Sequence, residues 1–252
     1  DVCSSDLDGD LPLEEIFRRA KIEQVTTDTP DPEELRRAYL ALGADGAKIL
    51  SIHVGSVFSR NYEVACQLRR ELAGRADIEV IDTQTVTLGL GLLALRAAML
   101  AARGDSRGQI EAVLGDLIAK MNTLVVIDDL QTLIRSGRVD RGQAALGSLL
   151  GVKPVLSIST GGETRVIGKP RGWEGALAFM LATISRHLRS GADDIIGVVH
   201  TGHPRVVAEI STILERRFSP RKVIITECSA ILGVHVGPGA MALCFLSELG
   251  RV

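Results

Sequence analysis

Short apolar runs of strand length alternate with longer amphipathic segments along this sequence, and that alternation most limits the folds it can adopt. Three strand candidates, rich in β-branched residues and bounded by polar residues or glycine, are residues 47–54 (AKILSIHV), 78–82 (IEVID) and 122–128 (NTLVVID). Three helix candidates, with apolar residues three and four positions apart, are residues 60–73, 86–103 and 106–120, the last with Ser106 as its expected N-cap. Because buried parallel strands read as continuous apolar runs and are joined by helices, the alternation predicts an α/β fold.

The second half of the chain begins with two strand candidates in direct succession. Residues 152–159 and 164–169 are separated by a turn with two glycines, which predicts an antiparallel hairpin. The remaining helix and strand candidates are residues 173–189, 195–200, 204–218 and 222–227, and they are followed by a last apolar segment, residues 241–246. We therefore expect two lobes that meet near Gly151. The N-terminal lobe, residues 8–151, has a mostly parallel sheet with helices on both faces, and the C-terminal α/β lobe, residues 152–252, has a mixed sheet.

Composition excludes several classes of function. The chain has 29 Lys and Arg against 31 Asp and Glu, and only eight aromatic residues (one Trp, two Tyr and five Phe), so nucleic acid is not expected as a partner. The longest apolar stretch, residues 86–100, contains Arg96 and is shorter than the roughly 20 residues of a membrane span. The four cysteines are widely spaced without a C-x-x-C pair, so we expect free thiols and a cytoplasmic location.

The first seven residues differ in character from the rest. Residues 1–7 (DVCSSDL) read as one translation frame of a common sequencing-adapter oligonucleotide. They contain no initiator Met, no positively charged segment and no apolar segment, so they do not form a signal peptide. We interpret them as an adapter-derived sequence and leave them out of the fold prediction.

Hydroxyl side chains gather in the loops beside the predicted strands, where ligands of open α/β sheets usually bind. Thr27 belongs to a hydroxyl cluster (TTDTP), and Ser56, Ser59 and Asn61 follow the strand candidate 47–54 at the point where a helix begins. The first N–H groups of a helix can bind an anion, and the same side chains can simply cap the helix. The sequence alone leaves both readings open. The loop of residues 55–61 lacks the lysine and the residue spacing of a phosphate P-loop.

A glycine-rich segment, residues 233–239 (GVHVGPG), contains a single imidazole. Its glycines, including Gly237 and Gly239, and its proline fix a tight backbone path. The segment therefore predicts a rigid loop in which His235 donates a hydrogen bond to an anionic ligand, and a purely structural histidine is the alternative.

Signatures of metal binding and catalysis are weak. His200 and His203 have no third ligand close by in the sequence, so zinc is not favoured. There is no G-x-S-x-G elbow, and neither Asp82 nor Asp128 is marked as the partner of a catalytic histidine. A binding protein without a cofactor is therefore the leading hypothesis. A serine-dependent lipid or ester hydrolase that uses Ser56 and a small-molecule sensor are the alternatives.

Seven motifs, in order along the chain, resemble the DegV family of fatty-acid-binding proteins, the lipid-presenting subunits of bacterial fatty acid kinase. They are residues 50–59 (LSIHVGSVFS, followed by Tyr62 and Ala65), 80–83 (VIDT), 89–93 (GLGLL), 135–138 (RSGR), 146–154 (LGSLLGVKP), 171–172 (RG) and 233–240 (GVHVGPGA). The resemblance runs from about residue 10 to residue 246. It implies an apolar tunnel between two α/β lobes for the acyl chain, with the carboxylate held at the tunnel mouth.

The resemblance also assigns individual residues. The family's carboxylate-binding threonine, serine and histidine fall on Thr27, Ser56 and His235. The residues expected to support them are Ser59, Asn61, Gly237 and Gly239. Arg171 matches a family arginine that contacts the kinase, so the resemblance implies a separate fatty acid kinase catalytic subunit as partner, with Arg171 on the surface at the end of the hairpin. It implies a bound long-chain fatty acid as ligand and no cofactor.

The sequence departs from the family pattern in several places. Gly55 stands where the family usually has serine, Val236 stands where it has threonine, and residues 27–29 (TDT) and 59–61 (SRN) replace Thr-Ser-Gln and Ser-Gly-Thr. Asp28 beside a bound carboxylate would be unfavourable unless it points to solvent. By the same resemblance, about 40 residues with an opening strand are expected before residue 10. We therefore expect the chain as written to have an incomplete N-terminal lobe and to aggregate or bind lipid poorly.

Overall fold

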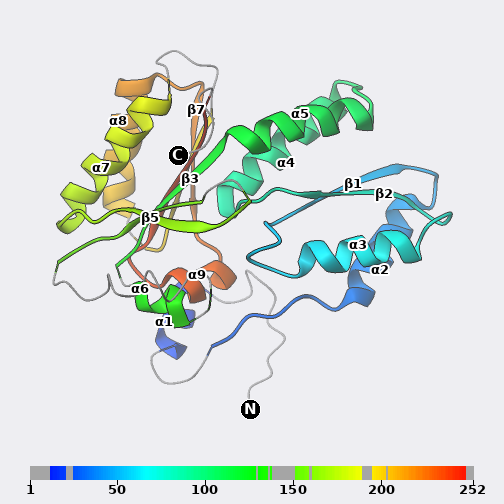
Figure 1. Ribbon diagram of the computed structural model, residues 1–252, viewed down its shortest axis with the longest axis horizontal. Coiled ribbons are helices and arrows are strands. Elements are labelled where there is room, and N and C mark those ends of the chain that lie inside the picture. Colours follow the sequence, from blue (N-terminus) through cyan, green and yellow to red (C-terminus); the bar gives the residue numbers. More distant parts are fainter. Residues whose placement is uncertain are drawn as a thin grey trace.

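The structure is a computed structural model with two sheets of different size (Figure 1). It describes residues 12–20, 25–128, 130–135, 137, 151–158, 161–188, 195–202 and 204–247. Several features predicted above lie outside the described residues, namely residues 1–7, His203, Arg138 and residues 146–150 of the LGSLLGVKP motif. The predicted fold class is confirmed, since the chain forms a small parallel sheet and a larger mixed sheet with helices packed on them.

The small sheet is formed by β1 (Lys48–His53) and β2 (Asp77–Asp82), which run parallel with His53 opposite Asp82. On one face lie α2 (Pro32–Gly43) and α3 (Asn61–Glu71), which bury an apolar cluster around Tyr39, Leu68 and Leu72. On the other face, Leu50 and Ile52 pack toward the helices that follow, so helices cover both faces as predicted.

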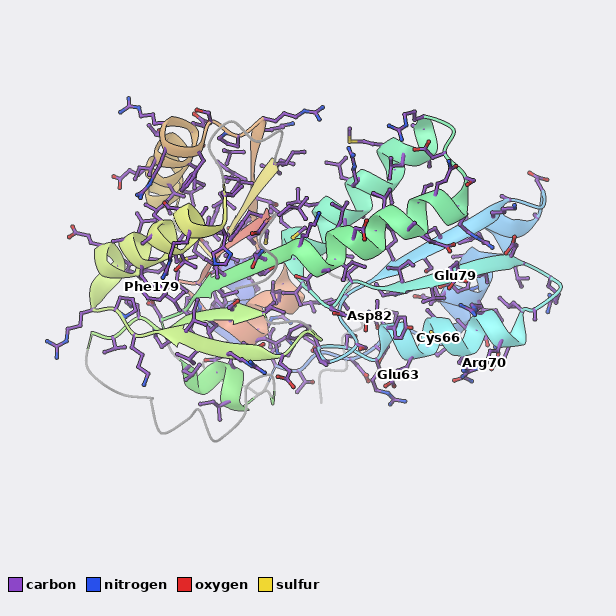
Figure 2. All side chains as sticks on the ribbon, turned by 45° about the horizontal axis from the view of Figure 1, so that its top comes forward. Glu63, Cys66, Arg70, Glu79, Asp82 and Phe179 are labelled. Atoms are coloured by element: carbon purple, nitrogen blue, oxygen red, sulfur yellow. The ribbon has the colours of Figure 1, made fainter. Side chains whose placement is uncertain are left out.

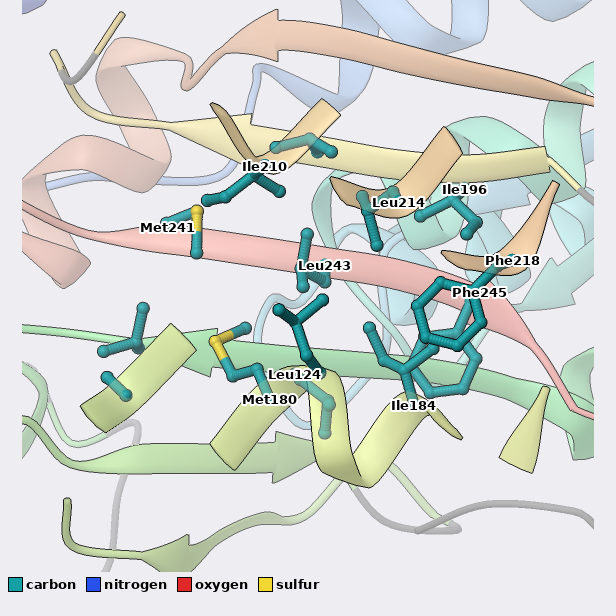
Figure 3. Packing of buried hydrophobic residues seen from close by; sticks show 14 of the residues in the cluster. Leu124, Met180, Ile184, Ile196, Ile210, Leu214, Phe218, Met241, Leu243 and Phe245 are labelled. Carbon is teal, nitrogen blue, oxygen red and sulfur yellow. The ribbon is translucent and has the colours of Figure 1, made fainter. Parts of the chain in front are cut away.

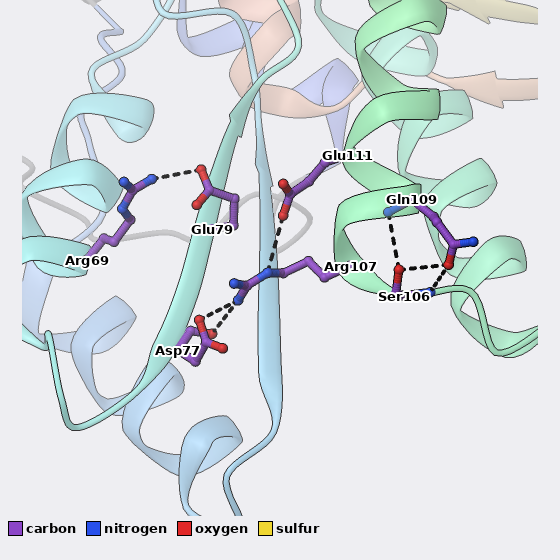
Figure 4. Close-up of polar contacts among 7 residues, drawn as sticks. All are labelled: Arg69, Asp77, Glu79, Ser106, Arg107, Gln109 and Glu111. Atoms are coloured by element: carbon purple, nitrogen blue, oxygen red, sulfur yellow. Dashed lines mark hydrogen bonds and ion pairs between the residues drawn. The ribbon is translucent and has the colours of Figure 1, made fainter.

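Two helices connect the small sheet to the large one. They are α4 (Thr87–Ala102) and α5 (Arg107–Lys120), and they lie between the two sheets in Figure 1. Ser106 caps α5 as predicted, because its side chain accepts a hydrogen bond from the backbone N–H of Gln109 while the Gln109 side chain accepts one from the backbone N–H of Ser106. Arg107 pairs with Asp77 at the start of β2 at 2.5 Å and with Glu111 at 3.2 Å, which ties α5 to the small sheet (Figure 4).

Within the described residues, the large sheet has six strands in the order β5-β4-β3-β8-β6-β7. Its strands are β3 (Met121–Val126), β4 (Val155–Ile158), β5 (Thr164–Gly168), β6 (Ile195–His200), β7 (Lys222–Glu227) and β8 (Met241–Leu246). The β6–β7 pair is parallel and the other pairs are antiparallel, including the predicted β4–β5 hairpin. Strands β6 and β7 match their predicted ranges residue for residue, and β8 has the bounds of the last apolar segment.

Strand β3 joins the large sheet although it precedes Gly151 in the chain. It pairs with β4 on one side and with β8 on the other, so it is not part of the sheet formed by β1 and β2. The expectation that residues 8–151 form one lobe therefore does not describe the sheet to which this strand belongs. The reason is that β8, which is distant from β3 in the sequence, inserts between β3 and β6. The boundary near Gly151 stays a prediction.

The main hydrophobic core lies between the large sheet and the helices α7 (Gly172–His187) and α8 (Pro204–Phe218). Figure 3 shows Leu243 and Phe245 of β8 packed against side chains of both helices, and both residues are fully buried. Three short helices, α1 (Leu13–Arg19), α6 (Leu130–Arg135) and α9 (Ala230–Val236), cluster beside the large sheet. None of these three was predicted, because each is only about two turns long.

Within the described part of the chain, no helix has both the length and the apolar character that crossing a bilayer requires.

Candidate functional site

A narrow apolar cavity lies between the start of α4 and the large sheet. Its walls include Val86 and Thr87 from the start of α4, Val199 from β6, and Leu232 and Val236 from α9. Its volume is about 40 Å³. This is room for no more than a few water molecules, so a long apolar tail could enter only if the surrounding side chains moved apart. The cavity therefore marks an apolar region beside α9.

Thr27 and His235 meet beside this cavity, although 208 residues separate them in the sequence. The Thr27 hydroxyl lies 2.9 Å from Nε2 of His235, and both side chains are half-buried. Thr27 comes from the extended segment before α2, and His235 comes from the last turn of α9. The structure thus brings together two of the three residues that were assigned to one site.

The predicted loop around His235 is a helix instead. Residues Ala230–Val236 form α9, whose first turn is capped by Ser229 through a 3.4 Å hydrogen bond from the backbone N–H of Leu232. The helix ends at Gly237, which has φ 74°, a conformation that glycine adopts without strain. The expectation was wrong because Ser229 caps a helix here and because the glycines from Gly237 on end that helix and do not shape the whole segment.

The turn between α9 and β8 is held by Thr201. The Thr201 hydroxyl donates a hydrogen bond to the carbonyl of Gly237 at 3.1 Å and accepts one from the backbone N–H of Ala240 at 2.8 Å. Gly239 also has a positive φ of 77°, and a Cβ atom there would lie 2.6 Å from Asp128. Gly237 and Gly239 therefore shape the backbone beside His235 and contribute no side chain to the site.

Ser56 makes a different contact from the one between Thr27 and His235. Its hydroxyl donates to Oδ2 of Asp82 at 2.6 Å, and its backbone N–H donates to Oδ1 of the same carboxylate at 3.1 Å. Ser56 follows β1, and Asp82 ends β2, so the parallel pairing of the two strands places them together. Figure 2 shows Asp82 at the inner end of the small sheet, facing the rest of the molecule. No pattern in the sequence marks Asp82 as the partner of Ser56, although the VIDT motif places an acid at the end of a strand.

Ser59 and Asn61 lie at the start of α3. The Ser59 hydroxyl accepts a hydrogen bond from the backbone N–H of Asn61 at 3.3 Å, which is a local turn contact just before α3. The side-chain oxygen of Asn61 is buried and has no hydrogen-bond partner in the structure. Asp28 is exposed and accepts a hydrogen bond from the backbone N–H of Thr29, so its charge points to solvent.

A polar chain runs along the face of β1 that is turned to α2. The hydroxyl of Tyr39 lies 2.7 Å from that of Ser51, which in turn lies 2.8 Å from Nε2 of His53. Burial lowers the pKa of His53, while the nearby charge of Asp82 acts in the opposite direction. The chain therefore ends beside the Asp82 carboxylate that holds Ser56.

Arg171 is exposed and precedes the first turn of α7. Its backbone forms an isolated bridge with Val152, so it lies next to the end of the hairpin as the sequence predicts. Among the described residues, no cluster of three or more His, Cys, Asp or Glu side chains could hold a metal ion.

Comparison with known proteins shows which protein family this chain resembles. The family model described as "Uncharacterised protein, DegV family" matches residues 5–248. A DegV domain-containing protein of Caldanaerobacter subterraneus subsp. tengcongensis is 30% identical over 237 residues, which are 94% of this chain and 84% of that protein.

Solved structures share the same fold. A fatty-acid-binding DegV family protein of Thermus thermophilus is 27% identical, with a TM-score of 0.86 over 95% of this chain and 86% of that one. The fatty acid kinase B3 protein of Streptococcus pneumoniae, solved with linoleic acid, has a TM-score of 0.85 over 95% of this chain and 85% of that one. At 17% identity, this second likeness shows the fold alone. The family model covers nearly the whole sequence, and the chain therefore belongs to the DegV family.

Proposed function

We propose that the protein binds a long-chain fatty acid, with its tail in the apolar region beside α9 and its carboxylate at Thr27, Ser56 and His235. The observation that carries this proposal is the position of α9. Leu232 and Val236 of this helix line the apolar cavity, while His235, on the neighbouring part of the same surface, reaches Thr27. One helix thus joins an apolar wall to a pair of groups that can donate hydrogen bonds to an anion.

The acyl tail and the head group contribute differently to the free energy of binding. Burying an acyl tail contributes about 0.8 kcal/mol per CH₂ group, or on the order of 10 kcal/mol before the costs of binding for a common fatty acid. Each hydrogen bond to a charged head group contributes about 1.5 to 3 kcal/mol. The tail therefore supplies most of the affinity, and the polar residues fix where the carboxylate lies. The Thermus thermophilus relative, 27% identical, is a fatty-acid-binding protein, which supports this assignment.

Presentation to a kinase is the second part of the proposal. The family resemblance implies that a separate kinase, carrying its own nucleotide, phosphorylates the carboxylate that this protein holds. Ser56 does not favour the alternative of a serine hydrolase, because its hydroxyl is bonded to Asp82 and not to an imidazole base. A non-catalytic carrier is therefore the function that we propose.

Ligand extraction tests the proposal directly. The full-length protein is purified under native conditions, and its bound lipid is extracted and identified by mass spectrometry. We expect one long-chain acyl species in an amount close to that of the protein. The absence of any acyl species, both from the purified protein and after incubation with a C16 fatty acid, contradicts the proposal.

Thr27→Val and His235→Ala are each expected to weaken fatty acid binding by about 1.5 to 3 kcal/mol, because each removes a hydrogen bond to the carboxylate. The measurement is calorimetric titration with a C16 fatty acid and, as a control, with the C16 alcohol, which has the same tail and no carboxylate. Binding of the alcohol should change little. Equal losses for the acid and the alcohol would show that the two residues support the fold and not the head group.

Arg171→Glu is expected to slow association with the kinase by about tenfold at low salt and to make the rate less dependent on salt, because an exposed charge at an interface acts mainly on association. Stopped-flow mixing of the lipid-loaded protein with the kinase measures this rate. Arg75→Glu is the matched control, since Arg75 is also exposed but lies just before the first residue of β2, in the small sheet. The same rate in both variants would remove Arg171 from the kinase contact.

A further inference from the structure

Asp82 engages both hydrogen-bond donors of Ser56. The hydroxyl donates to Oδ2 at 2.6 Å and the backbone N–H to Oδ1 at 3.1 Å, while the backbone N–H of Gln84 donates to Oδ1 at 2.9 Å. The carboxylate therefore joins the loop after β1 to the loop after β2. It also occupies the donors that a bound fatty acid would need from Ser56.

A serine hydroxyl has one proton and two lone pairs. While that proton is shared with Asp82, Ser56 offers only an acceptor to any other group. An ionised carboxylate is also only an acceptor, so it cannot form a hydrogen bond with Ser56 in this arrangement. A protonated carboxyl group can, because its O–H donates.

The surroundings of Asp82 do not neutralise it. Among the described residues, its contacts are the three hydrogen bonds above, and it forms no ion pair. The titratable groups that face it are His53 at the end of β1 and Tyr62 on α3, whose neighbour is Cys66. From the described part of the β4–β5 hairpin turn, the backbone N–H of Gly161 donates to the Gln84 side chain at 3.1 Å. A second carboxylate near Ser56 would therefore meet an unpaired like charge.

We propose that Asp82 is a specificity-determining residue that makes Ser56 accept a hydrogen bond from a protonated carboxyl group rather than donate one to a carboxylate. This inference rests on the proposed function, since it concerns the head group of the same fatty acid. The carboxyl O–H donates to Oγ of Ser56, and the carbonyl oxygen remains free to accept from Thr27 or His235. An ionised head group engages Ser56 only after Ser56 releases Asp82.

Asp82→Asn tests the proposal with little change of shape. The asparagine oxygen still accepts from the two backbone N–H groups, while its NH₂ group donates to Oγ of Ser56. The serine proton is then free for a carboxylate, and the like charge is gone. The bound head group should therefore ionise more readily in this variant than in the wild type.

Carbon-13 NMR of a C16 fatty acid labelled at its carboxyl carbon reads the ionisation of the bound head group directly. We expect the bound carboxyl to titrate at least about one pH unit lower in Asp82→Asn than in the wild type, which is a tenfold change in its ionisation equilibrium. Asp45→Asn is the matched control. Asp45 is exposed and lies before the first residue of β1, whereas Ser56 follows the last residue of that strand. Identical titrations in the wild type and Asp82→Asn overturn the proposal.

Ser56→Ala gives a second readout whose sign separates the two arrangements. If Ser56 accepts from the protonated group, its loss favours the ionised form, and the bound carboxyl titrates at lower pH. If Ser56 donates to the carboxylate, its loss shifts the titration to higher pH, and the proposal is wrong. The comparison is repeated in a His53→Gln background, where the difference between wild type and Asp82→Asn should persist if His53 is not its source.

The same experiment distinguishes a failure of the proposed function from a failure of the role proposed for Asp82. Absence of any bound fatty acid signal in the wild type contradicts the proposed function itself. A bound signal with unchanged titration in Asp82→Asn leaves the proposed function in place and overturns only the role of Asp82.

Discussion

Replacing Ala240 by leucine is expected to lower the affinity for a long-chain fatty acid on the order of a hundredfold. Ala240 is 3% exposed and lines the apolar cavity beside Val236 and Met241. Three added carbon atoms occupy much of a cavity of about 40 Å³ and exclude part of the tail. Excluding three or four CH₂ groups at about 0.8 kcal/mol each corresponds to a loss of about 3 kcal/mol. Calorimetric titration with a C16 fatty acid measures the change.

The control for this variant is Ala176→Leu. Ala176 is fully buried on α7, in the main core that α7 and α8 form with the large sheet, and it does not line the cavity. Overpacking costs about 1 to 3 kcal/mol of stability at either position, so the two variants differ mainly in where the added carbons lie. Because only Ala240→Leu fills the cavity, only that variant should lose affinity. Similar losses in both would show that the tail does not enter beside Ala240.

Phe245→Ala is expected to lower the free energy of unfolding by about 3 to 5 kcal/mol. Phe245 is fully buried on β8, which lies between β3 and β6 near the middle of the large sheet. Its ring packs with residues of α7 and α8 (Figure 3), so truncation leaves a cavity that rigid neighbours on several sides cannot fill. Urea denaturation followed by circular dichroism measures the loss as a lower midpoint.

Leu42→Ala is the matched control for the core substitution. Leu42 lies on α2 and is 61% exposed, so its truncation should change the free energy of unfolding by no more than about 0.5 kcal/mol. A loss below 1 kcal/mol in Phe245→Ala would contradict the placement of β8 in the centre of the core.

Local sequence was enough to predict most helices and strands. Strands β6 and β7 have the predicted bounds, and Ser106 caps α5 as predicted. These features depend on residues that are neighbours in the chain: apolar runs, spacing along a helix face, capping side chains and turn glycines. The short helix α9 was not predicted, because seven residues are too few for the apolar repeat of a helix to be recognised in the sequence.

The candidate site was only partly readable from the sequence. The motifs singled out Thr27, Ser56 and His235, and the structure places Thr27 and His235 in contact. Their role in binding a carboxylate stays a prediction. Asp82 was noted only as an aspartate without an assigned partner, because nothing in the sequence says that the ends of β1 and β2 lie side by side.

By itself, then, the sequence determined the local elements and the residue types that the site can use. Only the tertiary structure decided that β3 belongs to the large sheet, that β8 inserts beside it, and that Asp82 holds Ser56. The physical reason is that the residues of an apolar strand buried on both faces do not indicate which other strands pair with it in the sheet. Strand order and side-chain contacts between distant segments are set by the packing of the whole chain, where each pairing competes with every other arrangement that buries the same apolar surface.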